Sequence, residues 1–125
     1  MSAFIPNSFQ TPNAYIDRVM HLLTPEEFKV LIYAVRRILG FQKRRDRISL
    51  SQFVSGVSSG GSQKDHGTGL NRETVIRCLE SLVAFGLLTR KDEPRHPDGT
   101  LYILQLDSDA VDLAGLQKRQ QEKAT

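Results

Sequence analysis

The sequence NRETVIRCLESLVAFGLLTRK, residues 71–91, carries the pattern that decides the fold. Its first part predicts a helix over residues 71–85, because Asn71 is a favoured N-cap and Gly86 is a favoured C-terminal stop. The expected buried stripe of this helix has helical spacing and consists of Val75, Ile76, Leu79, Leu82 and Val83. A strand is predicted to begin directly after it, in residues 87–91.

Residues 101–106 are rich in β-forming side chains and predict a second strand that pairs with residues 87–91 as a hairpin. Pro97-Asp98-Gly99 lies between the two strands and is a turn signal. Residues 94–99 are therefore expected to form a long polar tip on this hairpin.

The strongest helix start in the chain is Thr24-Pro25-Glu26-Glu27. Thr24 can act as the N-cap, Pro25 suits the first helical position and Glu27 completes a capping box. The predicted buried face of this helix consists of Phe28, Leu31, Ile32, Val35, Ile38 and Leu39. Gly40 is predicted to end it.

Shorter elements complete the prediction. Asn13 is a favoured N-cap for an amphipathic helix with Ile16, Val19, Met20 and Leu23 on its apolar face. Arg47-Ile48-Ser49 predicts a short strand, and Ser49 or Ser51 then caps a brief helix through Leu50, Phe53 and Val54. Nine of the fifteen residues at 55–69 are Gly or Ser, which predicts a flexible loop.

The predicted order is helix, short strand, helix, helix and two-stranded hairpin, which is the layout of a winged helix-turn-helix. We therefore expect a mainly α fold with a small antiparallel β hairpin. The length of 125 residues fits one such domain. Its expected organisation is an extended arm at 1–12, the winged-helix domain at 13–106 with the long loop 55–69, and a short helix with a frayed polar tail at 107–125.

The helix at 71–85 predicts double-stranded DNA binding, since the major groove of B-form DNA accepts one α-helix. Its polar face and the hairpin supply residue types that contact bases or phosphates, namely Asn71, Arg72, Thr74, Arg77, Ser81, Arg90, Lys91 and Arg95. The alternative is that Arg72 and Arg77 are solvated surface residues of an ordinary three-helix domain, with Glu73 and Glu80 repelling phosphates.

The excess positive charge lies in one segment. Of the net charge of +3, residues 25–47 alone hold seven Lys or Arg against three acidic residues. Arg44 and Arg45 in this run are predicted DNA contacts, although a solvated surface explains such a run equally well. Lys64, in the long loop, is a further predicted phosphate contact beside the start of the helix at 71–85.

Six segments, in this order and spacing, also resemble a known family: FIPN (4–7), TPN (11–13), TPEEFKVL (24–31), RRILGFQK (36–43), ISLSQF (48–53) and GTGLNRETV (67–75). They resemble the start of bacteriophage replication proteins of the replication protein O type, over about residues 4–91. The resemblance implies a winged-helix domain that binds origin DNA, and a C-terminal part that recruits the replicative helicase or its loader. Because the chain stops at Thr125, that second part is expected to be missing or very short. The loop 55–69 is longer than the family's usual turn.

Enzymes, metal sites and membrane spans are not expected. His21, His66 and His96 are scattered, and no cluster has metal-ligand spacing. No strand leads into a phosphate-binding glycine loop, and no apolar run is long enough to span a bilayer. The chain begins without a signal peptide, and its single cysteine, Cys78, is expected to be packed and excludes an internal disulfide. A cytoplasmic protein without cofactors is therefore expected.

Two other functions stay open. A transcriptional regulator would share the same fold. A replisome protein-interaction module without DNA binding would dock through the helix at 13–23, whose apolar face would serve a partner or a second copy unless it packs on the core.

Overall fold

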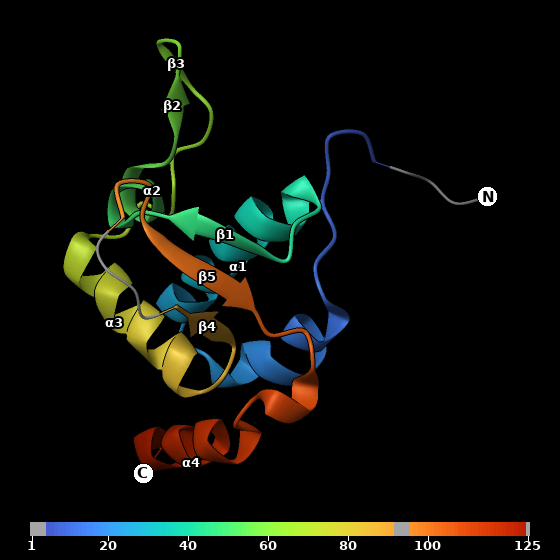
Figure 1. Cartoon of the computed structure of the whole chain (residues 1–125). Coiled ribbons are helices and arrows are strands. Elements are labelled where there is room, and N and C mark those ends of the chain that lie inside the picture. Colours follow the sequence, from blue (N-terminus) through green and yellow to red (C-terminus); the bar gives the residue numbers. More distant parts are fainter. Residues whose placement is uncertain (1–4, 92–95, 125) are drawn as a thin grey trace.

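The computed structural model describes residues 5–91 and 96–124 and has helices packed on a small antiparallel sheet (Figure 1). About half of the chain is helical, which makes this an α+β protein. The elements, in chain order, are η1 (Tyr15–Val19), η2 (Met20–Leu22), α1 (Pro25–Ile38), η3 (Leu39–Phe41), β1 (Arg45–Ile48), α2 (Leu50–Ser55), β2 (Ser58–Ser59), β3 (Ser62–Gln63), α3 (Arg72–Ala84), β4 (Leu88–Arg90), β5 (Thr100–Leu104), η4 (Ser108–Ala110) and α4 (Leu113–Ala124).

The main sheet has three strands in the order β1-β5-β4, all antiparallel. The predicted hairpin is confirmed as β4 and β5, with Leu88 opposite Leu104. The first strand begins earlier than predicted, at Arg45, and ends at Ile48. Ser49 lies outside this strand because its hydroxyl caps α2, where it accepts a hydrogen bond from the Gln52 N–H at 3.2 Å.

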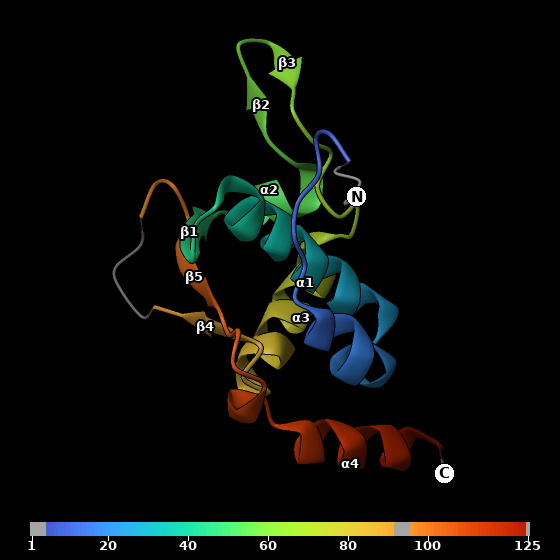
Figure 2. The same ribbon diagram turned by 90° about the vertical axis from the view of Figure 1, so that its right-hand side faces the viewer.

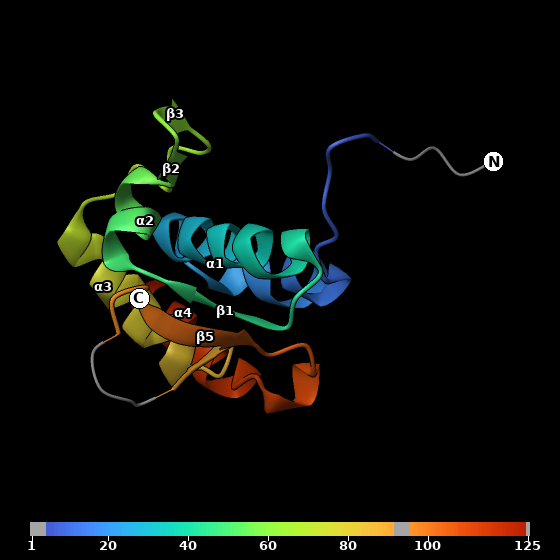
Figure 3. The ribbon, with the colours of Figure 1, turned by 45° about the horizontal axis from the view of Figure 1, so that its top comes forward.

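The core lies between the sheet and the helices α1, α2 and α3. In Figure 3, α1 and α2 lie above the strands β1 and β5, and α3 lies to their left. At its centre, the fully buried Phe53 ring lies 5.5 Å from the Tyr33 ring and 5.7 Å from the Tyr102 ring, measured between centroids. Cys78 of α3 is buried as predicted, and burial raises the pKa of its thiol to about 11.

The predicted N-caps of α1, α2 and α3 are confirmed, but the predicted cap Asn13 and the predicted end of α1 are wrong. Asn13 itself is helical, and the N-cap of η1 is Ala14, which makes no side-chain capping hydrogen bond. Thr24 and Glu27 form the capping box of α1, and Asn71 caps α3. Gly40 does not stop α1: it stays within the helical turn η3, and the left-handed residue is Gln42, with φ +58°. Gly40 instead makes room for Arg36, since a Cβ at residue 40 would lie 2.5 Å from the Arg36 Nη1.

The buried face of the first helical segment also differs from the prediction. Tyr15, Val19 and Leu22 are buried, whereas Ile16 and Met20 are 43% and 41% exposed. The physical reason is the geometry of η1, which is a π-helix, because its wider turns place different residues against the core than α-helical spacing does.

The prediction of a frayed tail is wrong. Residues 113–124 form the helix α4, which lies as a rod along the lower edge of the molecule (Figure 2). Leu116 is fully buried, and the Arg119 guanidinium pairs with the Glu27 carboxylate at 2.7 Å. No helix in residues 5–91 and 96–124 has the length and apolarity needed to cross a membrane.

Candidate nucleic-acid interface

The N-terminal end of α3 is an exposed polar tip. Asn71 accepts a hydrogen bond from the Thr74 N–H at 2.8 Å, which fixes the first turn. Arg72 and Arg77 are exposed, and the Arg77 Nη2 lies 3.4 Å from the Thr74 hydroxyl. Four of the predicted DNA contacts, Asn71, Arg72, Thr74 and Arg77, therefore lie within the first two turns of one helix.

A cleft of about 540 Å³ lies between the starts of α2 and α3 and the β4–β5 hairpin. Three cationic side chains line it, those of Arg47, Arg72 and Lys91. Its lining also contains the hydroxyl residues Ser49, Ser51 and Thr100, and the remaining lining residues are Ile48, Leu50, His96, Pro97, Gly99 and Tyr102. Among the described residues that line the cleft, none is an Asp or Glu. The cleft therefore suits an anion.

Two of the cationic residues of the cleft, Arg47 and Lys91, are positioned by the main sheet. Arg47 is on β1, opposite Leu101, and its Nη1 donates to the Gly99 carbonyl oxygen at 3.2 Å. Gly99 has φ +102°, and a Cβ there would lie 2.5 Å from the Ser49 nitrogen, so glycine is required for this close approach. The Lys91 N–H extends the β4–β5 ladder by donating to the Leu101 carbonyl oxygen at 3.0 Å.

Two of the predicted DNA contacts, Arg90 and Ser81, interact with other residues of the protein. Arg90 pairs with Tyr102 across the sheet. Burial raises the pKa of the Tyr102 hydroxyl, and the charge of Arg90 and its hydrogen bond to that hydroxyl act in the opposite direction. Ser81 faces α1 rather than the polar face of α3, because it hydrogen bonds to the Glu27 carboxylate. The structure does not bring these two residues into the cleft.

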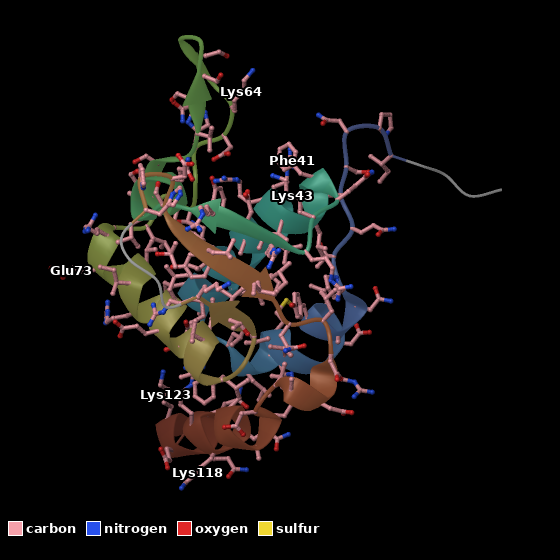
Figure 4. The ribbon with its side chains drawn as sticks, viewed as in Figure 1. Phe41, Lys43, Lys64, Glu73, Lys118 and Lys123 are labelled. Atoms are coloured by element: carbon pink, nitrogen blue, oxygen red, sulfur yellow. The ribbon has the colours of Figure 1, made fainter. Side chains whose placement is uncertain are left out.

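The remaining predicted contacts lie elsewhere. The cleft is lined by Arg47 and Ile48, at the last two positions of β1, whereas Arg44 and Arg45 precede or begin that strand. Lys64 stands on a projecting arm, well away from Glu73 of α3 (Figure 4), and not beside the start of that helix as predicted. Arg95 lies outside the described residues.

The predicted loop at 55–69 contains a short hairpin. Strands β2 and β3 pair with Ser59 opposite Ser62, and Gly60 and Gly61 between them have φ +59° and +77°. Positive φ at both central residues is the signature of a type I′ turn, which fits the twist of a two-residue hairpin. The segment predicted as a flexible loop therefore contains a regular hairpin at residues 58–63.

The two ends of the segment 57–66, which we call the arm, lie close together. The Thr68 N–H donates to the Phe53 carbonyl oxygen at 2.8 Å and the Gly69 N–H to the Val54 carbonyl oxygen at 3.2 Å. A Cβ on Gly67 would lie 2.7 Å from the Gly56 nitrogen, so the two ends of the arm touch. The connection from α2 to α3 is thus a short turn with residues 57–66 inserted as an arm.

Deleting residues 57–66 and joining Gly56 to Gly67 is expected to leave a folded protein with unchanged duplex affinity. The chain ends already meet, and a change in loop length alters closure entropy by only about 0.6 kcal/mol per doubling. The deletion removes the hydrogen bond of 3.0 Å from the Tyr33 hydroxyl to the Asp65 carboxylate. The variant Tyr33→Phe removes the same bond alone and is expected to lower the free energy of unfolding by about 1 kcal/mol. Thermal melting and duplex titration check both expectations. A weaker duplex complex at an unchanged melting temperature would place the arm in the interface.

Several cleft residues were missed by sequence reasoning. From the sequence, Ser49 and Ser51 are predicted only as helix caps and His96 only as part of the hairpin tip, and Thr100, between the predicted tip and the predicted strand, has no predicted role. The sequence feature that could have identified them is the predicted short strand beside Ser49. A strand that pairs with the hairpin brings Ser49 and Ser51 close to His96 and Thr100. Within residues 5–91 and 96–124, no group of three or more His, Cys, Asp or Glu side chains is placed to hold a metal ion.

Comparison with protein-family models, with curated proteins and with solved structures finds no match for this chain.

Proposed function

We propose that this chain is a double-stranded DNA-binding domain of the winged helix-turn-helix type. In this proposal α3 is the recognition helix and the β4–β5 hairpin is the wing. The element order and the sheet order β1-β5-β4 support it, as does the pinched turn between α2 and α3. The single observation that carries it is the cationic cleft, because it adjoins the exposed tip of the helix that would enter the major groove.

In this proposal, neighbouring residues have two different tasks. Asn71, Thr74 and Arg77 lie on the exposed first turns of α3, where they would reach base edges. Arg72 and Lys91 line the cleft, where they would hold backbone phosphates and fix the register of the helix on the duplex. The positive end of the α3 dipole adds to the attraction for phosphate at this point.

The biological role that we propose is initiation of DNA replication at an origin. It rests on the six sequence segments that resemble phage replication proteins, and a helicase or helicase loader is the partner that this role implies. The interaction-module alternative relied on the apolar residues at 13–23. Tyr15, Val19 and Leu22 of that segment pack in the core, so part of its apolar character has a structural explanation.

A salt titration of duplex binding tests the proposal. The wild-type affinity for duplex DNA is expected to fall steeply between about 50 and 200 mM salt, because bound phosphates release counterions. Arg72→Gln and Lys91→Gln are each expected to reduce the slope of the log–log plot by about 0.9, the value for one lost phosphate contact. Fluorescence anisotropy with a labelled duplex measures both quantities.

Lys118→Gln is the matched control, because it removes the same charge from α4, at the other end of the molecule (Figure 4). It is expected to leave the slope unchanged. Equal effects of Arg72→Gln and Lys118→Gln would show that only net charge matters, and would remove the cleft from the interface.

A further inference from the structure

An exposed aromatic and cationic cluster lies where α1 ends. The Arg36 guanidinium carbon lies 5.7 Å from the centroid of the Phe9 ring and 5.0 Å from that of the Phe41 ring. Both rings are open to solvent, Phe41 at 56% exposed and Phe9 at 37%. A large apolar ring held at the surface on one side by a guanidinium leaves its other side available for stacking.

The backbone around Phe41 is built to hold the ring outward. The chain leaves α1 through Gln42 in the left-handed region, with the Lys43 N–H bonded to the Ile38 carbonyl oxygen at 3.0 Å and the Gln42 N–H to the Leu39 carbonyl oxygen at 2.9 Å. This is the Schellman pattern, whose left-handed position normally holds Gly. A non-glycine residue there is strained by about 1–2 kcal/mol. The Arg36 side chain lies against Gly40 in this turn.

Cationic side chains follow the ring directly. Lys43 is half-exposed and its Nζ lies 3.6 Å from the Asp46 carboxylate, a weak pair at this exposure. Arg44 is exposed and enters no ion pair within the described part of the chain. Figure 4 shows Phe41 and Lys43 together at the end of α1, apart from Glu73 on α3. We name Phe9, Arg36, Phe41, Lys43 and Arg44 the stacking patch.

We propose that the stacking patch binds single-stranded nucleic acid, at a site separate from the duplex interface. A base would stack on the open face of Phe41 and continue the stack of Phe41, Arg36 and Phe9, while Lys43 and Arg44 neutralise the adjoining phosphates. Aromatic rings beside cationic side chains are the combination that binds single strands without sequence preference, because every base has a π-face. An acidic peptide would use the same cations but would gain nothing specific from a flat stacking surface.

Binding of a labelled oligothymidine of about 12 nucleotides, within the usual site size of such surfaces, tests the proposal. Phe41→Ala is expected to weaken this complex about fivefold or more, whereas Phe41→Tyr, which keeps an aromatic ring, is expected to bind like the wild type. Arg44→Gln is expected to reduce the salt slope by about 0.7, the single-strand value for one phosphate. The exposure of Phe41 means that both ring variants should fold, and thermal melting verifies this.

The two proposed sites are distinguished in the same assay. Phe41→Ala is expected to leave duplex affinity unchanged, and Arg72→Gln to leave oligothymidine affinity unchanged. The proposal is overturned if oligothymidine does not bind at about 50 mM salt, or if Phe41→Ala and Phe41→Tyr bind it equally well. It is also overturned if oligoglutamate competes as strongly as oligothymidine and depends equally on Phe41, since the patch would then dock an acidic peptide.

Discussion

Arg119→Met is expected to lower the free energy of unfolding by about 3–5 kcal/mol, the usual cost of breaking a buried ion pair from one side. The Glu27 carboxylate that would lose its partner is only 4% exposed. Arg119 holds it in a bidentate pair, with Nη1–Oε2 at 2.7 Å and Nη2–Oε1 at 2.8 Å. The same guanidinium donates to the Leu22 carbonyl oxygen at 3.0 Å and lies 5.0 Å from the centroid of the Phe85 ring. The substitution therefore removes the main polar attachment of α4.

Urea unfolding followed by circular dichroism measures this loss, and two variants control it. Lys118→Met removes an exposed cation from the neighbouring position of α4 and is expected to change the stability by less than about 0.5 kcal/mol. The double variant Glu27→Gln with Arg119→Met leaves no buried charge and is expected to recover part of the stability. If Arg119→Met and Lys118→Met are equally stable, the pair contributes nothing beyond a surface charge.

The same pair sets a dependence on pH. Burial acts to raise the pKa of Glu27, but hydrogen bonds from Arg119, from the Thr24 N–H and from Ser81, together with the charge of Arg119, outweigh it and lower the pKa below its ordinary value of 4.5. A carboxyl group whose pKa is lower in the folded state stabilises the fold fully above the unfolded pKa, and this contribution is lost as the pH falls through the folded pKa. Without Arg119, burial would raise the pKa of Glu27 in the folded state, and the sign of the dependence reverses. Protonation of Glu27 then favours the fold, so lowering the pH is expected to restore part of the stability that Arg119→Met loses, as measured by urea unfolding at several pH values.

The parts of the fold that could be predicted are those that neighbouring residues determine. The capping box of α1 and the Asn71 cap need only side chains three residues away, so the sequence pattern was sufficient. The docked helix α4 could not be predicted in the same way. Its residues after Leu116 have no apolar face, and their attachment depends on Glu27, which lies 92 residues earlier and already had an explanation as a capping residue.

The candidate interface also combines residues that the local sequence pattern predicts with residues that only long-range contacts bring together. Arg72 belongs to a helix face that periodicity reveals, and it lies in the cleft. Arg47 reaches the cleft because β1 pairs with β5, which is a long-range contact. In the sequence, Arg47 belongs to the same basic run as Arg44 and Arg45. Only the register of β1 against β5 shows that Arg47 lines the cleft and that the other two do not. Gly40 misled the prediction because the left-handed backbone position is taken by Gln42, two residues later.

Phe53→Ala is expected to lower the free energy of unfolding by about 3–5 kcal/mol, because it deletes a fully buried ring and leaves a cavity. The ring makes a tilted contact with Tyr33 of α1 and an edge contact with Tyr102 of β5, so it joins α2 to both layers of the fold. The Phe53 carbonyl oxygen also accepts hydrogen bonds from the Thr68 N–H at 2.8 Å and from the Thr68 hydroxyl at 2.7 Å. A shift of α2 would therefore move the base of the arm and the cleft together.

Phe53→Leu is the matched control, since it keeps most of the apolar volume and is expected to cost less than Phe53→Ala. Urea unfolding gives both stabilities, and a duplex titration at a temperature where both variants are folded gives the second readout. Because α2 positions Ser49 and Ser51 in the cleft, Phe53→Ala is expected to weaken duplex binding even in its folded state, and Phe53→Leu to weaken it less. Two variants that differ in stability but bind the duplex equally well would show that the position of α2 does not matter for the interface, and would leave α3 and the hairpin as its only supports.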